Sequence, residues 1–416
     1  MEHFKKYLIL ILLTGSSFHQ LKAQLPARDL DYFIQEAVKR SPLLKDYENQ
    51  QQAKRIDSMR VKAGYLPQVT ASSAGMYAPV INGYGFDEVL TNGKSLEALL
   101  NVNYNLAGKK NVSNQLQGIR LQSDSLKFAS HLSVLDLQKA IADQYITAFA
   151  SQQQAVFNHE VYLLLHEEEQ VLKKLTRANV YKQADYLTFL VTFQQQALQW
   201  KQAELQLKND YSTLNYLTGV TDTIAHPLTE PVLQQVPVAE ENSFFTHRFE
   251  IDSARIENQK RAIDFSYRPK AGIYANGGYN SSFAFQPYRN FGTSVGFTVS
   301  VPVYDGHQKK MQYDQLTIAK RTSDLYKDFF LKQHAQQLDL LKQQINDQDG
   351  LYQQVNEQIK FTKSLIRVDS RLLQTGDIRI ADFVIAINNY MAAQNLMRQT
   401  NINRLKLVNQ LNYWNR

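Results

Sequence analysis

Two polarity patterns divide the chain, one with the period of a helix and one with the period of a strand. Apolar residues at intervals of three or four predict long helices at about 109–178, 185–218, 307–374 and 382–415. Alternation with period two predicts strands at about 68–78, 96–107, 270–283 and 293–304. The clearest strand places Val295, Phe297, Val299 and Val301 on one face, with Gly, Ser and Thr between them. The predicted fold class is therefore mainly α with a small β portion.

The same order of elements occurs twice: helix, strand, strand, long helix and returning helix. Landmarks recur at similar offsets, and Gly306 follows Gly108 by 198 residues (306 − 108). Such internal similarity indicates a duplication. We interpret residues 24–219 as the first repeat and residues 245–416 as the second, joined by a proline-containing connector at 220–244.

A break in the helical pattern also occurs twice. Asn179 and Gly376 both tolerate the left-handed conformation that is common just past a helix end, and they lie 197 residues apart (376 − 179). Each stands six positions before an aspartate, Asp185 (185 − 179) or Asp382 (382 − 376), which can cap the following helix. The pattern thus predicts the same helix-turn-helix in both repeats.

The long helices carry charged residues throughout. A helix over residues 109–178 would have about 70 residues and a length of ~105 Å. Residues such as Arg120, Asp124 and Lys127 interrupt its apolar positions, which excludes a lipid-facing helix and is typical of coiled-coil-like packing in water.

The N-terminus and the composition indicate export. Residues 1–23 have the order of a secretory signal peptide, with Lys5 and Lys6 ahead of an apolar run. The chain has no cysteine, which excludes disulfides, a lipid-modified N-terminal cysteine and a thiol-based site. The net charge of +7 becomes +5 without the signal peptide (7 − 3 + 1) and is spread along the chain, so we expect no nucleic-acid partner.

Four strands are too few to close a membrane barrel, because the smallest such barrels have about eight. Either the strands form an exposed sheet, or several chains pool them, in which case three chains would supply twelve. Aromatic residues near the strand ends are typical of the interfacial girdle of a membrane barrel: Tyr77, Tyr104, Tyr279, Phe283 and Tyr304. The alternative is an ordinary soluble sheet, which shows the same alternation.

The chain resembles the TolC-type outer-membrane efflux channel family. The resemblance rests on the duplicated halves, on Leu66-Pro67 before the first strand, on Val301-Pro302-Val303-Tyr304-Asp305-Gly306 at the end of a strand, and on two breaks followed by aspartates. It implies a homotrimer in which twelve strands form an outer-membrane β-barrel, continued by a long α-helical barrel through the periplasm. It also implies contact with a periplasmic adaptor protein, and through it with an inner-membrane pump.

The resemblance assigns roles to residues at the breaks. It places the adaptor-contacting tips at Ala178, Asn179, Val180, Thr375, Gly376 and Asp377. It places a pore constriction at Asp382, with Asp185 at the matching position of the first repeat, and Ile385 stands where some members have a second aspartate. Arg379 and Arg371 are candidates for ionic contacts that hold the entrance closed; the alternative is that they are solvated surface arginines.

No pattern indicates catalysis, a metal site or a cofactor. His159 and His166 lie two helical turns apart, about 10.5 Å along the axis, which is too far for one metal. With Glu160 and Glu167–Glu169 they are interpreted as a solvated charged face. We therefore expect a passive exit duct of a tripartite efflux or type I secretion system, located in the outer membrane and reaching into the periplasm. The alternative is a soluble periplasmic coiled-coil scaffold or adhesin, suggested by the glutamine-rich helices.

Overall fold

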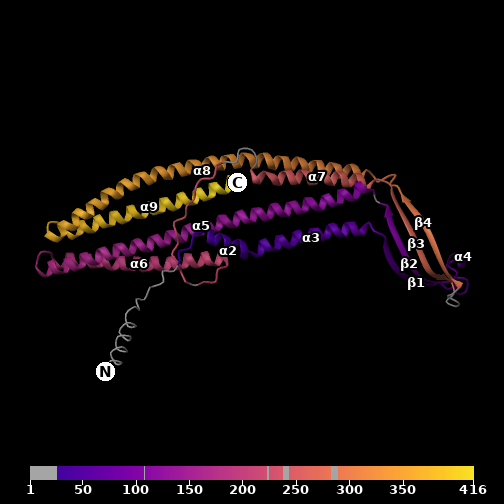
Figure 1. Ribbon diagram of the computed structural model, residues 1–416, viewed down its shortest axis with the longest axis horizontal. Helices are drawn as coiled ribbons and strands as arrows, with labels where there is room; N and C mark the ends of the chain where they lie inside the picture. Colours follow the sequence, from indigo (N-terminus) through magenta and orange to yellow (C-terminus); the bar gives the residue numbers. More distant parts are fainter. Residues whose placement is uncertain (1–25, 107, 223, 238–242, 283–288) are drawn as a thin grey trace, which may run out of the picture. The chain divides into compact units, whose positions relative to one another are not determined.

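The computed structural model describes residues 26–106, 108–222, 224–237, 243–282 and 289–416 (Figure 1). The predicted signal peptide 1–23 and the girdle residue Phe283 lie outside these residues. The elements of the first repeat are α2 (Leu30–Arg40), α3 (Pro42–Gly64), β1 (Gln68–Tyr77), α4 (Glu88–Thr91), β2 (Lys94–Leu106), α5 (Lys109–Arg177) and α6 (Gln183–Thr218). Those of the second are the short 3-10 helix η1 (Phe244–Thr246), α7 (His247–Ser266), β3 (Lys270–Ser281), β4 (Phe291–Ser300), α8 (Gln308–Thr375) and α9 (Ile380–Trp414).

This order confirms the predicted fold class, mainly α with a duplicated helix, strand, strand, long helix, helix arrangement. The structure divides into two compact units, and each draws on both repeats. The first unit comprises Met1–Ser41, Leu137–Gln235 and Leu341–Asn412. The second comprises Pro42–Asp136, Val236–Leu340 and Tyr413–Arg416. Across the described residues, each helix is either too short or too polar to cross a membrane.

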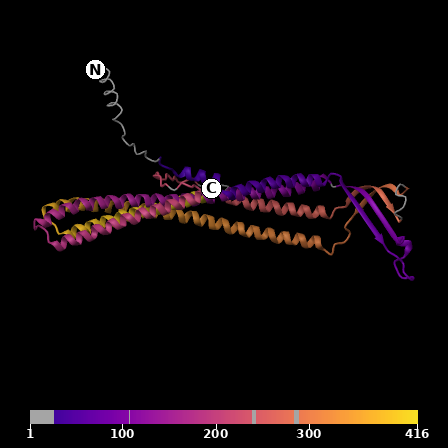
Figure 2. The same cartoon turned by 90° about the horizontal axis from the view of Figure 1, so that it is seen from below.

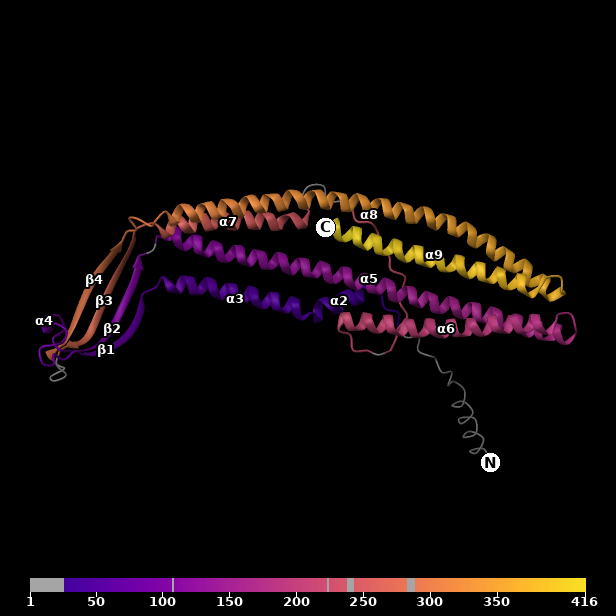
Figure 3. The same ribbon diagram turned by 180° about the vertical axis from the view of Figure 1, so that it is seen from behind.

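The first unit consists of paired helices. In it α5 runs beside α6, and α8 beside α9, in the views from both sides (Figure 1, Figure 3). One buried cluster joins α2 to α5 and α6 and contains Phe33, Ala37, Ile141, Tyr145, Ala148, Phe149, Tyr211, Leu214 and Leu228. The buried hydroxyl of Tyr145 lies 3.0 Å from the carbonyl oxygen of Arg28 and 2.7 Å from that of Thr229. This tyrosine therefore fixes the start of the described chain to the connector.

The second unit contains the sheet. Its four strands pair antiparallel in the order β1-β2-β3-β4 and lie side by side in every view (Figure 2). Pro67 precedes β1 and Pro269 precedes β3, since a proline ends a helix and favours an extended residue before it. Because both hairpins keep the chain order, the two repeats contribute adjacent halves of one sheet.

Candidate functional site

The two helix breaks share one main-chain geometry. Asn179, after α5, has a φ of 61°, and Gly376, after α8, has a φ of 83°. In both turns the next amide, that of Val180 or Asp377, donates at 2.9 Å to the carbonyl five residues earlier (180 − 175 and 377 − 372). This is a Schellman motif, in which a left-handed residue lets the last helical carbonyls find donors. The predicted left-handed residues are therefore present at both breaks.

The aspartates after the breaks do not cap the next helices, so this part of the prediction is wrong. Helices α6 and α9 begin at Gln183 and Ile380, and Asp185 and Asp382 are each the third residue of their helix. The N-cap of α6 is Lys182, whose side chain makes no capping hydrogen bond in the part of the chain that the structure describes. The two residues before each aspartate are already helical, so each carboxylate lies in the first turn of its helix and not at the N-cap. An acid there still interacts favourably with the helix dipole.

Asp382 pairs with Arg379 instead. Nε and Nη2 of Arg379 each donate to a carboxylate oxygen of Asp382 at 2.8 Å, and these hydrogen bonds raise the pKa of Arg379. The arginine side chain is 83% exposed, so the pair contributes little to stability. Within the described ranges the structure records no ion pair for Asp185 or Arg371. Of the four predicted pore residues, it therefore brings together only Arg379 and Asp382.

The two turns pack against each other. A Cβ added at Gly376 would lie 2.7 Å from Cγ1 of Val180. The hydroxyl of Tyr181 lies 3.0 Å from the carbonyl oxygens of both Leu373 and Ile378 and donates its hydrogen to them. Burial raises the pKa of this hydroxyl. The first turn is thus anchored on the second, through a tyrosine that the sequence analysis did not single out.

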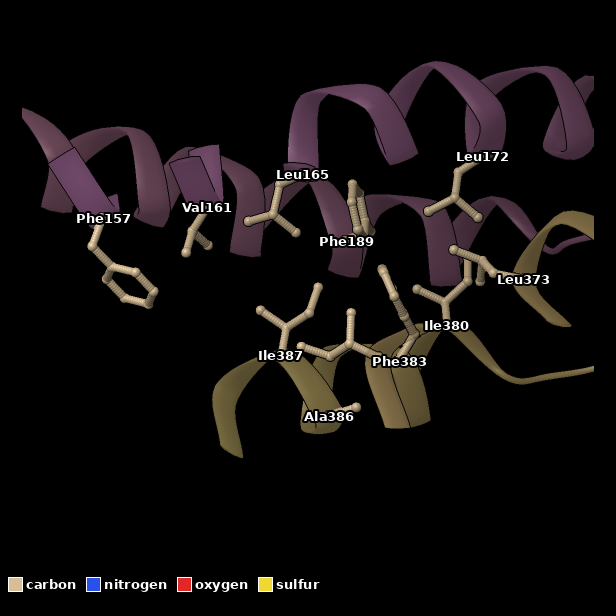
Figure 4. Close-up of a cluster of buried hydrophobic side chains, with 11 residues drawn as sticks. Phe157, Val161, Leu165, Leu172, Phe189, Leu373, Ile380, Phe383, Ala386 and Ile387 are labelled. Carbon is tan, nitrogen blue, oxygen red and sulfur yellow. The ribbon is translucent and has the colours of Figure 1, made fainter. Parts of the chain in front are cut away.

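A cluster of buried apolar side chains supports the turns (Figure 4). Its members come from α5, α6, α8 and α9: Phe157, Val161, Leu165, Leu172, Phe189, Ile366, Leu373, Ile380, Phe383, Ala386 and Ile387. Figure 4 shows Phe189 of α6 and Phe383 of α9 pointing into the same space between the helices. The turns therefore stand on a closely packed base rather than on a mobile loop.

The predicted tip residues lie on the outside of this base. Ala178, Asn179, Val180, Thr375 and Asp377 are exposed, and Gly376 is half-buried. A partner protein can therefore reach five of the six.

Two acids beneath the turns contradict the interpretation of Glu167–Glu169 as a solvated face. Glu168 is 5% exposed and Glu169 is 7% exposed. Burial raises the pKa of Glu168, which accepts a hydrogen bond from Ser370, while its second carboxylate oxygen has no hydrogen-bond partner among the described residues. Glu169 accepts from the hydroxyl of Tyr186 at 2.6 Å, and this bond raises the pKa of Tyr186 to about 12.

A third buried acid lies on α8. Burial, and then the charge of Asp382, raise the pKa of Asp369. An i, i+3 or i, i+4 pattern cannot reveal these groups, because the helices that bury them come from distant parts of the sequence. The rest of the predicted solvated face is largely present: Glu160, His166 and Glu167 are exposed, whereas His159 is half-buried with its ring 4.4 Å from that of Trp200.

One face of the sheet is apolar across all four strands. The register places Val102 opposite Val69 and Ala275, and Ala275 opposite Val295. Val295 and Phe297 are 77% and 79% exposed. A single chain thus presents its apolar strand residues to the surroundings.

The opposite face is polar and largely uncharged. It carries Thr70, Ser72, Asn101, Asn103, Asn105, Asn276, Ser294 and Thr298. Asn101 donates to Ser72, and Ser294 donates to Asn276, both at 2.8 Å. The outer edges of β1 and β4 have no partner strand in the described part of the chain.

Two predictions about the sheet are wrong in detail. Val301 is not in a strand, because β4 ends at Ser300, directly before the Val301-Pro302 step that Pro302 restricts. Among the aromatic residues predicted to form an interfacial girdle, Tyr77 and Tyr304 are exposed, but Tyr279 is buried, with its ring against that of Phe291.

Comparison with known proteins shows similarity at the level of structure. No protein-family model and no curated protein matches the sequence. Among solved structures, the outer membrane protein VceC from Vibrio cholerae has a TM-score of 0.74 at 12% identity, over 93% of this chain and 96% of that one. The MtrE outer membrane channel of Neisseria gonorrhoeae has a TM-score of 0.74 at 13% identity, over 93% and 88%. The Campylobacter jejuni CmeC outer membrane channel has a TM-score of 0.72 at 11% identity, over 93% and 85%. With its duplicated halves, its paired helix breaks and its four-stranded sheet, the chain has the fold of these outer-membrane channels.

Proposed function

We propose that this chain is the outer-membrane channel of a tripartite efflux or type I secretion system, a passive exit duct and not an enzyme. In this proposal three copies pool their strands into a twelve-stranded barrel, and their helices continue as an α-helical barrel in the periplasm. The observation that carries the proposal is the apolar sheet face, which a single chain leaves uncovered.

Both unusual features of the sheet disappear in a membrane trimer. Burying a valine or phenylalanine side chain is worth about 1.5–3 kcal/mol, so lipid around Val295, Phe297 and Val299 would be strongly favourable. The open edges of β1 and β4 would pair between neighbouring copies, and closure removes an edge that otherwise promotes aggregation. The neutral polar face would then line a water-filled lumen.

The helix breaks supply the partner surface in the same proposal. Ala178, Asn179 and Val180, with Thr375, Gly376 and Asp377, would contact a periplasmic adaptor protein, which links the duct to an inner-membrane pump. The packed base beneath the turns supports this role, because a contact surface needs a fixed shape. Asp382, paired with Arg379, would stand at the pore constriction.

The first experiment is localisation. The expressed protein should fractionate with the outer membrane, run as a trimer after detergent extraction and form channels in planar bilayers. A soluble periplasmic monomer would refute the proposal and would favour the coiled-coil scaffold or adhesin.

A matched pair of lysine substitutions tests the orientation of the sheet. Phe297→Lys places a charge on the apolar face of β4, and Thr298→Lys places the same charge on the polar face one residue later. Lysine on a lipid-facing strand costs about 2–4 kcal/mol at the bilayer midplane, whereas lysine facing a lumen has no such cost. We expect Phe297→Lys to reduce the heat-stable, membrane-inserted trimer and Thr298→Lys to retain it. Equal insertion of both variants would show that the apolar face does not meet lipid.

A further inference from the structure

A basic cavity lies in the second unit where the strands meet the helices. It has a volume of about 590 Å³ and lies between the start of α5, the end of α7 and the adjoining ends of β2 and β3. Its lining includes four cationic residues, Lys109, Lys110, Arg268 and Lys270, and no acid among the described residues. A cavity with four positive charges and no carboxylate favours an anion.

The four cations have no ion-pair partner within the described residues. The neighbouring acid, Asp264, is already paired with Lys309 at 3.0 Å. Arg268 instead lies over the ring of Phe265, 4.6 Å from its centroid. Arg268 interacts electrostatically with Asp264, and the described residues place no acid in an ion pair with any of the four cations.

The placement of the lysines is also unfavourable for the helix that carries them. Lys109 and Lys110 are the first two residues of α5, a helix of 69 residues with no acid in its first turn. A cation at a helix N-terminus is repelled by the positive end of the helix dipole, where an anion is stabilised. A bound anion would reverse the sign of this interaction.

The second repeat shows what an anion does at the equivalent position. There Asp305, next to Gly306, accepts hydrogen bonds from the amides of His307 at 2.9 Å and Lys309 at 2.7 Å, at the start of α8. These amide hydrogen bonds lower the pKa of Asp305. The first repeat has no acid beside Gly108, so its helix start lacks the carboxylate that its duplicate carries.

We propose that the cavity bounded by Lys109, Lys110, Arg268 and Lys270 binds a phosphate-bearing anion, supplied by the headgroup of an anionic phospholipid. The lipid source rests on the proposed function, which places the apolar sheet face in the membrane. Leu106 and Ala271 belong to that face, are paired in register and also line the cavity. The cavity thus combines an apolar edge with cationic groups, as a phospholipid with its headgroup requires.

Native mass spectrometry of the detergent-solubilised protein tests the proposal, because it counts bound lipids without requiring membrane insertion. The probes are phosphatidylglycerol, phosphatidylcholine and inorganic phosphate, each added alone, followed by phosphatidylglycerol with phosphate as competitor. The first variant is Lys109→Gln with Lys110→Gln. The matched control is Lys327→Gln with Lys332→Gln, which removes two exposed lysines of α8 that have no recorded ion pair in the described residues.

A third variant supplies the anion from the chain itself. A Cβ at Gly108 meets nothing within 4 Å, and Gly108 has no positive φ, so Gly108→Asp should fold. Its carboxylate would stand at the residue directly before α5, where it can accept hydrogen bonds from amides of the first turn, and would compete with the external anion.

We expect the wild type to bind phosphatidylglycerol in preference to phosphatidylcholine. Its affinity for phosphatidylglycerol should fall roughly fivefold for each lysine removed. Gly108→Asp should also lose the preference, and the α8 control should keep it. Equal retention of both lipids with no phosphate binding, or equal losses in the control, would overturn the site. Binding of phosphate without a preference for phosphatidylglycerol would overturn the lipid source. A protein that fails to reach the outer membrane would refute the proposed function, while these binding measurements would still decide the site.

Discussion

Replacing Gly376 by alanine should destabilise the packed turns through two separable effects. The first is conformational: Gly376 has a φ of 83°, and a non-glycine residue in the left-handed region costs about 1–2 kcal/mol. The second is steric: the new methyl group would lie 2.7 Å from Cγ1 of Val180, and overpacking of this kind costs about 1–3 kcal/mol. The expected total is about 2–5 kcal/mol of local stability.

A double-mutant cycle separates the two effects. Val180→Ala removes the methyl group that the alanine at 376 would meet, so the double variant should recover the steric part and keep the conformational part. Asn179→Ala is the control for the conformational part, because Asn179 has a φ of 61° and already carries a Cβ. It should cost only about 1 kcal/mol, the scale of a single left-handed residue.

Hydrogen exchange followed by mass spectrometry provides the measurement, with peptides that cover residues 172–187 and 366–383. Protection of the amides in both peptides should fall in Gly376→Ala and partly return in the double variant. If the cost of Gly376→Ala is the same with and without Val180, the two turns are not in contact in solution and the packed tip is refuted.

Three further predictions concern the charges and hydroxyls near the turns. Asp382→Ala leaves Arg379 unpaired and adds one positive charge per chain, so the reversal potential of the proposed channel in a salt gradient should shift towards anion selectivity; an unchanged potential would remove Asp382 from the pore. Glu168→Gln should stabilise the tip at neutral pH by about 1 kcal/mol or more, because the partner-free carboxylate oxygen is buried. The raised pKa of Glu168 means that the folded state holds its proton more tightly, so stability should fall as pH rises from the ordinary carboxyl pKa through the raised one, and this slope should be absent in the variant. Tyr181→Phe removes the hydrogen bonding between the turns and should lower protection at 366–383 by about 1 kcal/mol.

The fold could be predicted from the sequence because its signals are local and repeated. Long runs of helical period, short runs of strand period and two prolines before strands each report on a few neighbouring residues. The left-handed residues at Asn179 and Gly376 were found for the same reason, since a helix end needs a residue that tolerates positive φ. The duplication then supported each assignment with a second example.

The electrostatics of the site could not be predicted in this way. Glu168 and Glu169 look solvated on their own helix, but both are buried, and their hydrogen-bond partners lie on other helices: Ser370 on α8 and Tyr186 on α6. The contact of Val180 with Gly376 likewise depends on how two turns meet. Capping by Asp185 and Asp382 was predicted wrongly because a helix start depends on the residues before the acid as well as on the acid itself.

The two repeats keep the same backbone at the turns but differ in charge. Arg379 donates two hydrogen bonds to the carboxylate of Asp382, a bidentate geometry that the planar guanidinium makes possible. In the first repeat Lys182 stands at the corresponding N-cap, and the structure records no ion pair between it and Asp185 among the described residues. The same divergence occurs at the strand ends: both α5 and α8 carry two lysines in the first turn, but only the start of α8 has an acid, Asp305, that accepts hydrogen bonds from its amides. Because the two repeats keep the same backbone at the turns but carry different charged side chains, the electrostatic properties of the turns and of the helix starts differ between the repeats.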